Sequence, residues 1–535
     1  MPSDELRGPG AIAVDETVVE QLARDRLGFD DLRPGQLRAV AAAAAGRDVL
    51  AVLPTGGGKS AIYELAGMRE GPTLVVSPLI ALQDDQVAHL RRAGLTAIVL
   101  NSHQSPREHA AALADSCGPD AFVFCAPEQL SNAETREVLQ RARPGLFAVD
   151  EAHLISQWGH DFRSDYLRLG AQADALAVPV RVALTATASP PVRQEICRRL
   201  ELRDPEIVVG DFDRAHISLA ARSVRTEDEK LRELVATVAD LAGAGIVYAA
   251  THASAEAARA TLAAAGESVT LYHAGLSSRA RREAMTTFLD GSARIVAATV
   301  AFGMGIDKAD VRWILHVDPP PSLDAYYQEI GRAGRDDEAA SAHLLYRSED
   351  FGAAVHFISG GVSRRVVERV ATMLESGADV PPTRATTAAL VRLTDLGAAA
   401  WDAEGTVSWS GALTVAAAVA ASDAETRREN EIERSRLEMM RRYAEHTGCR
   451  RSFLLSYFGQ SHPGGCGNCD NDIAVGALTA TAEPFAVGRR VVSDHWGEGT
   501  VQRYDGDQLT VLFDDHGYRD LLVPLVVQRS LLRPA

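Results

Sequence analysis

The first residues whose types and spacing could do chemistry lie in a glycine-rich stretch, LPTGGGKS at 53–60. An apolar run at 49–53 precedes it and an amphipathic segment follows it, which is the strand–loop–helix order of a phosphate-binding loop. Glycines let backbone N–H groups converge on a phosphate chain, Lys59 can reach the β- and γ-phosphates, and Ser60 can hold Mg²⁺. A glycine-rich loop with a chance lysine is the alternative interpretation. The predicted nucleotide contacts are Thr55, Gly56, Gly57, Gly58, Lys59 and Ser60.

Two adjacent carboxylates, Asp150 and Glu151, follow a second apolar run at 146–149. In open α/β sheets ligands bind at the carboxyl ends of the strands, so this pair belongs on the same edge as the glycine-rich loop. We expect Asp150 to hold Mg²⁺ and Glu151 to polarise an attacking water. An acidic pair is weak evidence alone and gains weight from the loop upstream.

A pair of arginines, Arg332 and Arg335, stands in YYQEIGRAGRDD after a segment compatible with a helix. Offered across a cleft between two lobes, such arginines can stabilise charge that develops on the γ-phosphate. A solvated charged loop is the ordinary interpretation of GRAGR taken alone. The phosphate-binding loop earlier in the chain favours the catalytic interpretation.

Alternating strand and helix patterns must position these residues. TLVVSP, TAIVL, AFVFCAP and VALTATAS form one series, and GIVYAA, VTLYH, RIVAATV and WILHVD form a second. This alternation predicts an α/β fold with two parallel-sheet lobes in tandem, at 21–210 and 211–350, after an N-terminal extension at 1–20. Only the first lobe carries the phosphate-binding loop.

Composition limits the class of protein. At 535 residues the chain is too long for one core, and 46% hydrophobic with 24% charged residues describes a soluble globular protein. No apolar run approaches the ~20 residues needed to cross a bilayer, and the first residues lack the layout of a signal peptide. Six cysteines do not make a disulfide framework at this length, so a reducing cytosol is expected. The net charge of −17 disfavours coating of nucleic acid by bulk electrostatics but permits a basic groove.

The order of these motifs over about 27–350 resembles the RecQ family of superfamily 2 DNA helicases. LPTGGGKS, VVSPLIALQDDQV and DEAHLISQWGHDFR are followed by ALTATA, YHAGL, VAATVAFGMGIDKADVRWILH and QEIGRAGRD. FDDLRPGQ resembles the adenine-recognising motif of that family, which implicates Arg33 and Gln36, and QEIGRAGRD adds Gln328 to the nucleotide contacts. The resemblance implies RecA-like lobes, ATP and Mg²⁺, and 3′ to 5′ unwinding of DNA in repair and recombination in the bacterial cytosol, at the nucleoid.

The stretch SQWGHDFR at 156–163 directly follows the acidic pair and carries aromatic side chains. Aromatic faces stack on single-stranded bases without reading their sequence. In RecQ proteins this loop is the DNA sensor, so the resemblance implies DNA contacts by Trp158, His160, Phe162 and Arg163. The alternative is that Trp158 and Phe162 only pack between lobes.

Residues 351–420 show an amphipathic helix, a second helix, a glycine stop and a short hairpin pattern. This succession resembles a winged-helix module, which often grips duplex DNA. A helical spacer with an incidental hairpin is the alternative. In the RecQ family the winged helix comes after the cysteines, so its position here departs from the usual order.

The segment CRRSFLLSYFG…CGNC resembles the RecQ zinc-binding subdomain, which we expect at 421–475. Its three thiolates are one short of a closed tetrahedral zinc site: Cys449, Cys466 and Cys469. The family has a fourth cysteine at the place of Asp472, and a carboxylate oxygen there is the favoured fourth ligand. His446 and His462 are the alternative ligands, and an empty site is the alternative to bound zinc.

A linker at 476–486 precedes four or five short strand patterns at 487–535, separated by WGEG, DGD and DDHG turns. They predict a small SH3-like or Tudor-like barrel. It resembles the C-terminal domain of UvrD/PcrA-type helicases, in which such a barrel docks proteins, RNA polymerase among them. The resemblance implies a protein partner for the barrel, such as RNA polymerase or a repair factor, besides single-stranded and forked DNA.

Two further functions compete with a DNA helicase. One is an RNA helicase or a translocase that strips proteins without separating strands. The other is a scaffold that binds forked DNA and recruits a partner, with hydrolysis as a switch. The residues that favour an active motor are Lys59, Asp150, Glu151 and Arg335.

Overall fold

The computed structural model divides the chain into two compact units. Unit 1 comprises Met1–Asp211 with Gly361–Arg427, and unit 2 comprises Phe212–Gly360 with Arg428–Ala535. The structure describes residues 16–535 except 30, 55–56, 69–70, 79, 102–103, 105–106, 108–110, 113, 115–117, 119–120, 156–165, 167, 304–307, 353–361, 382, 402–405, 463, 475–483, 506–507 and 530. Within these described segments, no helix is both long and apolar enough to cross a membrane.

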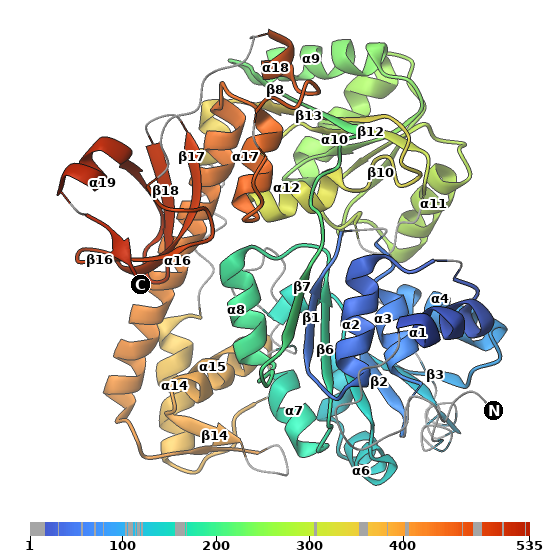
Figure 1. Ribbon diagram of the computed structural model, residues 1–535, viewed down its shortest axis with the longest axis vertical. Helices are drawn as coiled ribbons and strands as arrows, with labels where there is room; N and C mark the ends of the chain where they lie inside the picture. Colours follow the sequence, from blue (N-terminus) through green and yellow to red (C-terminus); the bar gives the residue numbers. More distant parts are fainter. Residues whose placement is uncertain are drawn as a thin grey trace. The chain divides into compact units, whose positions relative to one another are not determined.

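Unit 1 is built on a seven-stranded sheet in the order β3-β4-β2-β5-β6-β1-β7, and the strands pair in parallel (Figure 1). Its strands are β1 Val49–Val52, β2 Thr73–Val76, β3 Ala97–Leu100, β4 Phe122–Cys125, β5 Leu146–Val149, β6 Arg181–Thr185 and β7 Glu206–Val209. The central strands are buried on both faces, which explains their continuous apolar runs.

Helices cover this sheet and complete the first lobe. They are α1 Glu16–Leu22, η1 Ala23–Leu27, α2 Pro34–Ala44, α3 Ser60–Ala66, α4 Ile80–Arg92, η2 Pro127–Ser131, α6 Ala133–Ala142, η3 Ala152–Ile155, α7 Leu169–Ala175 and α8 Pro190–Arg199. Pro34 and Pro190 each begin a helix, where the missing N–H costs nothing.

A helix–helix–hairpin module also belongs to unit 1. It contains α14 Arg364–Glu375, α15 Arg384–Asp395, and the antiparallel pair β14 Ala399–Trp401 and β15 Val407–Trp409. The start of α16, Val415–Glu445, completes its small apolar core. Arg199 at the end of α8 pairs with Asp395 at 2.7 Å, so the module is attached to the first lobe. Its winged-helix role stays a prediction.

Unit 2 contains a six-stranded parallel sheet in the order β10-β11-β9-β12-β13-β8. Its strands are β8 Ile217–Ser223, β9 Ala244–Tyr248, β10 Val269–Tyr272, β11 Ile295–Ala298, β12 Val311–His316 and β13 Ala340–Tyr346. The helices are α9 Glu227–Asp240, α10 His252–Ala264, α11 Ser278–Leu289 and α12 Leu323–Ile330. Together they form the second lobe.

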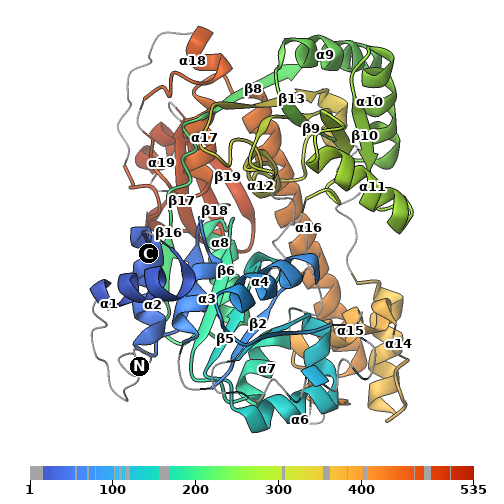
Figure 2. The ribbon, with the colours of Figure 1, turned by 90° about the vertical axis from the view of Figure 1, so that its right-hand side faces the viewer.

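The remainder of unit 2 is the end of α16, the helices α17 Arg450–Tyr457 and α18 Asp470–Ala474, and a five-stranded antiparallel sheet. The sheet contains β16 Arg490–Ser493, β17 Gly497–Asp505, β18 Gln508–Phe513, β19 Gly517–Leu522 and β20 Arg533–Pro534, with α19 Val523–Arg529. It lies beside α16 and α17 (Figures 1 and 2). The two parallel-sheet lobes, the helical region and a C-terminal β-domain are thus confirmed, whereas closure into a barrel and the domain boundaries stay predictions.

Candidate nucleotide site and metal centre

The phosphate-binding loop joins β1 to α3 and requires glycine at two described positions. A Cβ on Gly57 would lie 2.7 Å from the carbonyl oxygen of Pro54. Gly58 has a φ of +64°, and a Cβ there would lie 2.5 Å from Nε2 of Gln36. Side chains at either position would therefore strain the loop. Thr55 and Gly56 lie outside the described residues.

Lys59 and Ser60 stand where the loop enters α3. The Lys59 ammonium donates to the Leu53 carbonyl at the end of β1, over 3.4 Å. Both side chains remain partly exposed. A long, weak contact of this kind leaves the lysine able to turn toward a phosphate.

Gln36 fastens the start of α2 to the phosphate-binding loop. Its buried carboxamide accepts the N–H of Arg33 at 2.7 Å and donates to the Gly58 carbonyl at 2.8 Å. Arg33 itself is exposed. The residues of the expected adenine motif therefore lie beside the loop, and their contact with the base stays a prediction.

Asp150 and Glu151 lie at the carboxyl end of β5, as expected. Asp150 accepts the N–H of Glu151 at 2.9 Å, and Glu151 adopts a φ of +50°. Desolvation raises the pKa of Asp150 to about 7, the charge of Glu151 adds to this effect, and the charge of Lys59 opposes it. A carboxylate pair in this state attracts a hard cation with oxygen ligands, and Mg²⁺ fits that requirement.

A chain of close polar contacts connects Glu151 to the neighbouring strand β6. His153 is buried, and its Nδ1 lies 3.3 Å from a Glu151 oxygen and 2.9 Å from Oγ1 of Thr185. The Thr185 hydroxyl in turn donates to the Thr187 carbonyl over 3.0 Å. The predicted site residues do not include His153, Thr185 and Thr187, although the motifs DEAH and ALTATA contain them.

The predicted arginines belong to unit 2 and follow α12. Arg332 is buried and donates to the Gly303 carbonyl, and Arg335 is partly exposed. Gln328 is partly exposed on α12. The nucleotide loop belongs to unit 1, so the catalytic role of these three residues stays a prediction.

The residues of the expected DNA loop, Trp158, His160, Phe162 and Arg163, lie outside the described part of the chain. Tyr166, which follows them, is fully buried, and its hydroxyl donates to the Asp150 carbonyl over 3.4 Å. The chain that follows this stretch therefore returns to the backbone of Asp150, the predicted magnesium ligand.

Three thiols and one carboxylate gather in the helical part of unit 2. The sulfur atoms of Cys449, Cys466 and Cys469 and a carboxylate oxygen of Asp472 all lie within 4.8 Å of one another. The cluster does not include His446, whose ring packs on Phe453 at 4.9 Å between centroids. A compact set of three sulfurs and one oxygen fits four-coordinate Zn²⁺.

Electrostatics and hydrogen bonds also favour a cation at this cluster. Burial raises the pKa of Cys449 to about 12 and raises that of Cys466, so neither thiolate is stable without a nearby positive charge. Burial opposes the charge of Asp472, but hydrogen bonds from Cys466 and Cys449 outweigh it and lower the pKa. One Asp472 oxygen also accepts the N–H groups of Cys466 and, at 3.2 Å, Gly467.

The same segment covers the edge strand of the second lobe. The N–H of Leu219 in β8 donates to the Asn468 carbonyl over 3.2 Å, and the N–H of Ala221 donates to Asp470 over 3.0 Å. Asp470 also accepts from Arg450 in the first turn of α17. The metal-binding segment thus satisfies backbone groups that an open sheet edge would expose.

Comparison with known proteins agrees with this arrangement. The chain matches the DEAD/DEAH box helicase family over 33–196, the helicase conserved C-terminal domain over 228–337, and the RecQ zinc-binding family over 414–473. The probable ATP-dependent DNA helicase RecS of Bacillus subtilis is 37% identical over 338 residues, which cover 63% of this chain and 68% of that protein. The chain belongs to the RecQ family.

Longer relatives of this RecQ-family chain are the ATP-dependent DNA helicases RecQ of Pasteurella multocida and Bacillus subtilis. They are 33% and 32% identical over 86% and 84% of this chain. The chain spans just under two thirds of their length, 63% and 66%. The crystal structure of the DUF1998 helicase MrfA bound to DNA has a TM-score of 0.51 and 16% identity over 76% of this chain and 60% of that one, which shows a shared fold.

Proposed function

We propose that this RecQ-family protein is an ATP-dependent helicase that unwinds duplex DNA in the 3′ to 5′ direction during repair or recombination. The proposal rests on the residues at the carboxyl ends of β1 and β5. There the positive charge of Lys59 opposes the rise in the pKa of Asp150, and Glu151 contacts His153. The relatives named as ATP-dependent DNA helicases support the nature of the substrate.

A small set of residues would bind the nucleotide and support its hydrolysis. Ser60 and Asp150 would hold Mg²⁺, which when bound neutralises charge on the phosphates. Lys59 binds the γ-phosphate, and Glu151 orients and polarises the attacking water while His153 holds its carboxylate in place. Arg332 and Arg335 of the second lobe would stabilise charge on the transferred phosphoryl group.

The proposed coupling to DNA rests on the described residues that flank the aromatic stretch at 156–163. The loop at 156–163 is bounded by η3, which carries His153, and by Tyr166, which contacts Asp150. Stacking of bases on Trp158 and Phe162 would therefore act on the carboxylates from both ends of the loop. Zn²⁺ held by Cys449, Cys466, Cys469 and Asp472 would stabilise the fold of unit 2 rather than take part in hydrolysis.

Two further parts of the proposal are the protein partner and the cellular location. The C-terminal sheet supports a protein contact with RNA polymerase or a repair factor, and the protein would work on nucleoid DNA in the cytosol.

The deciding experiment compares strand separation on 3′-tailed and 5′-tailed DNA duplexes and on matched RNA duplexes, with ATPase rates recorded on the same strands. We expect unwinding of the 3′-tailed DNA alone. Unwinding of RNA would reassign the substrate. Hydrolysis without strand separation would favour a translocase, and DNA binding without stimulated hydrolysis would favour a scaffold.

A further inference from the structure

Helix α12 ends two residues before Arg332, and its first turn is held by a buried charge. Asp324 is 3% exposed, and its Oδ2 accepts from Nη2 of Arg436 in α16 at 2.8 Å. The hydroxyl of Tyr457 in α17 donates to the same oxygen. Arg436 and Tyr457 are also buried. Two elements distant in sequence therefore contact the first turn of α12.

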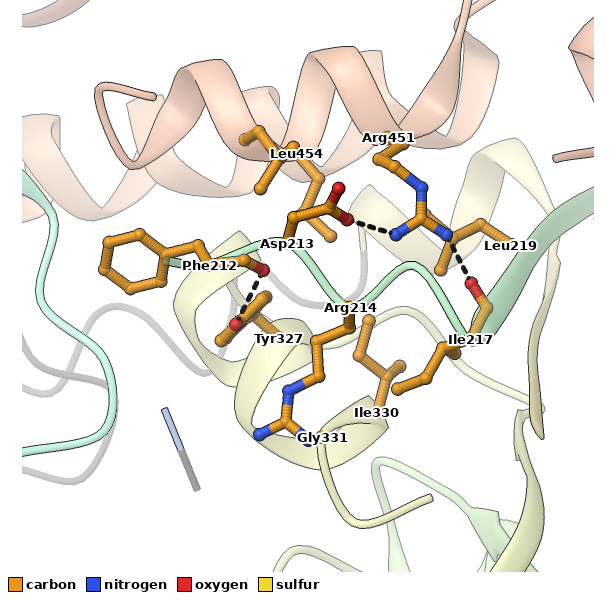
Figure 3. Close-up of a pocket in the computed structure, with 11 residues that line it drawn as sticks. Phe212, Asp213, Arg214, Ile217, Leu219, Tyr327, Ile330, Gly331, Arg451 and Leu454 are labelled. Carbon is orange, nitrogen blue, oxygen red and sulfur yellow. Dashed lines mark hydrogen bonds and ion pairs between the residues drawn. The ribbon is translucent and has the colours of Figure 1, made fainter. Parts of the chain in front are cut away.

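The next turn of α12 contacts the same two helices. The hydroxyl of Tyr443 in α16 donates to that of Tyr326 over 3.3 Å. Phe458, which follows α17, packs on Tyr327 at 4.9 Å between ring centroids. Tyr327, Ile330 and Gly331 of this region line a cavity of about 20 Å³ together with Arg451 and Leu454 of α17 (Figure 3). The helix is therefore held along its length, from Asp324 to the residues just before Arg332.

The C-terminal sheet joins this arrangement through β19. The Tyr518 ring lies 5.5 Å from that of Tyr457, and Tyr518 is 8% exposed. A Cβ on Gly517 would lie 2.3 Å from Oγ of Ser435 in α16, so the strand approaches that helix closely. Arg519 pairs with Glu431 nearby.

We propose that Asp324, Arg436, Tyr457 and Tyr518 are positioning residues through which the docked C-terminal sheet sets the place of α12, and thereby the rate at which Arg332 and Arg335 support ATP hydrolysis. The inference rests on the proposed ATPase. An eight-residue helix is a rod of about 12 Å, so a shift at Asp324 moves its far end as well. The sheet acts here on its own chain, apart from any outside partner.

The chemistry of the cluster supports a positioning role over simple packing. A buried ion pair contributes little net stability compared with an apolar cluster of the same volume, because both charges must leave water. Its hydrogen bonds are directional, and they therefore specify one position of the helix. Burial opposes the charge of Arg436, yet Asp324 and Glu433 raise its pKa well above the ordinary value, so the guanidinium stays charged.

The test uses the full chain and three variants. Tyr457→Phe removes one hydroxyl from Asp324, and Tyr518→Leu removes the ring that packs on Tyr457. Arg519→Ala is the control, because it removes the pair with Glu431 from the same strand and, within the cluster, loses only a contact with the backbone carbonyl of Tyr518. Steady-state ATPase with single-stranded DNA gives kcat and KM, hydrogen exchange reports on the α12 peptide, and thermal unfolding reports on the fold.

We expect Tyr457→Phe and Tyr518→Leu to lower kcat about fivefold or more, with KM for ATP within about twofold, and to speed exchange in 323–335. Arg519→Ala should keep both readouts close to those of the unaltered protein. If both cluster variants keep the kcat and the exchange rate of the parent, and the parent hydrolyses ATP normally, the inference is wrong and the proposed function stands. If the parent protein shows no DNA-stimulated hydrolysis, the proposed function is wrong. Exchange in the α12 peptide still tests the coupling in that case, and unchanged exchange in the two cluster variants would contradict it.

Discussion

Asp150 in the nucleotide site and Asp472 in the metal centre are both predicted to bind a cation, yet their surroundings act on them in opposite directions. Asp150 is desolvated beside a second carboxylate, which raises its pKa to about 7. Asp472 accepts backbone and thiol hydrogen bonds, which lower its pKa despite burial. In the proposed function, Mg²⁺ that arrives with a nucleotide would supply the positive charge that the first site lacks. In the second, hydrogen bonds already hold the carboxylate of Asp472 in its charged form beside the three thiols.

The largest effect is expected at the nucleotide site. Lys59→Ala should reduce DNA-stimulated ATP hydrolysis about a hundredfold or more, because the γ-phosphate loses its cationic contact. Thermal unfolding without nucleotide should change little, since the lysine makes one long hydrogen bond to the protein. Arg47→Ala, which alters an exposed pair with Glu206, is the matched control. Unwinding that survives Lys59→Ala would contradict the mechanism.

The metal centre should lose its ion entirely when a thiolate is removed. The purified protein should contain about one zinc per chain, and Cys466→Ser should bring this close to zero and lower the melting temperature, because metal binding and local folding are coupled. Metal analysis and calorimetry give the two readouts. Cys197→Ser, at a thiol outside the cluster, should retain the zinc. A zinc-free parent protein with three freely titrating thiols would show that the site does not bind metal.

The fourth ligand allows a finer comparison. Asp472→Ala should weaken zinc retention by more than about a hundredfold, whereas His446→Ala should cost no more than about tenfold. Asp472→Cys should bind zinc more tightly than the parent, because a fourth thiolate suits this ion. X-ray absorption of the parent should show three sulfur neighbours near ~2.3 Å and one oxygen near ~2.0–2.2 Å. A nitrogen in fourth place would favour an imidazole.

The smallest effect concerns Glu64, a buried carboxyl on α3 behind the phosphate-binding loop. Neither oxygen accepts a hydrogen bond from a described residue, the nearest imidazole is His89 at 3.9 Å, and burial raises the pKa of Glu64 from 4.5 to about 7. The protonated form is favoured by folding, so stability is present below pH 4.5 and is lost as pH rises toward about 7.

Glu64→Gln should therefore gain stability relative to the parent as pH rises through that window, by about 1–3 kcal/mol at pH 8. Denaturant unfolding at a series of pH values measures the difference. If the difference in the free energy of unfolding between the two proteins stays constant from pH 5 to 8, Glu64 is ionised in the folded protein. The result measures the effect of burial alone on the pKa of a carboxyl group. The comparison of Asp150 with Asp472 requires this effect to be distinguished from the effect of a bound cation.

The amino-acid pattern alone predicts the two lobes, the loop around Lys59 and the acidic end of β5, and the family resemblance favours Asp472 over His446 and His462 as the companion of three cysteines. These features depend on neighbours close along the chain: an apolar run, a glycine turn, a C-x-x-C spacing. Local conformational preference and periodicity decide such features before the chain folds.

Only the tertiary structure decided the contacts between distant residues. Glu64 and Asp324 look like ordinary charges on helices, and only packing shows that both are buried. The hydrogen bond from Arg436 to Asp324 joins residues 112 apart in sequence, and the one from Tyr457 joins residues 133 apart. The physical reason is that burial of a charge, and the partner that compensates it, depend on which surfaces meet in the folded chain, and no local pattern records that.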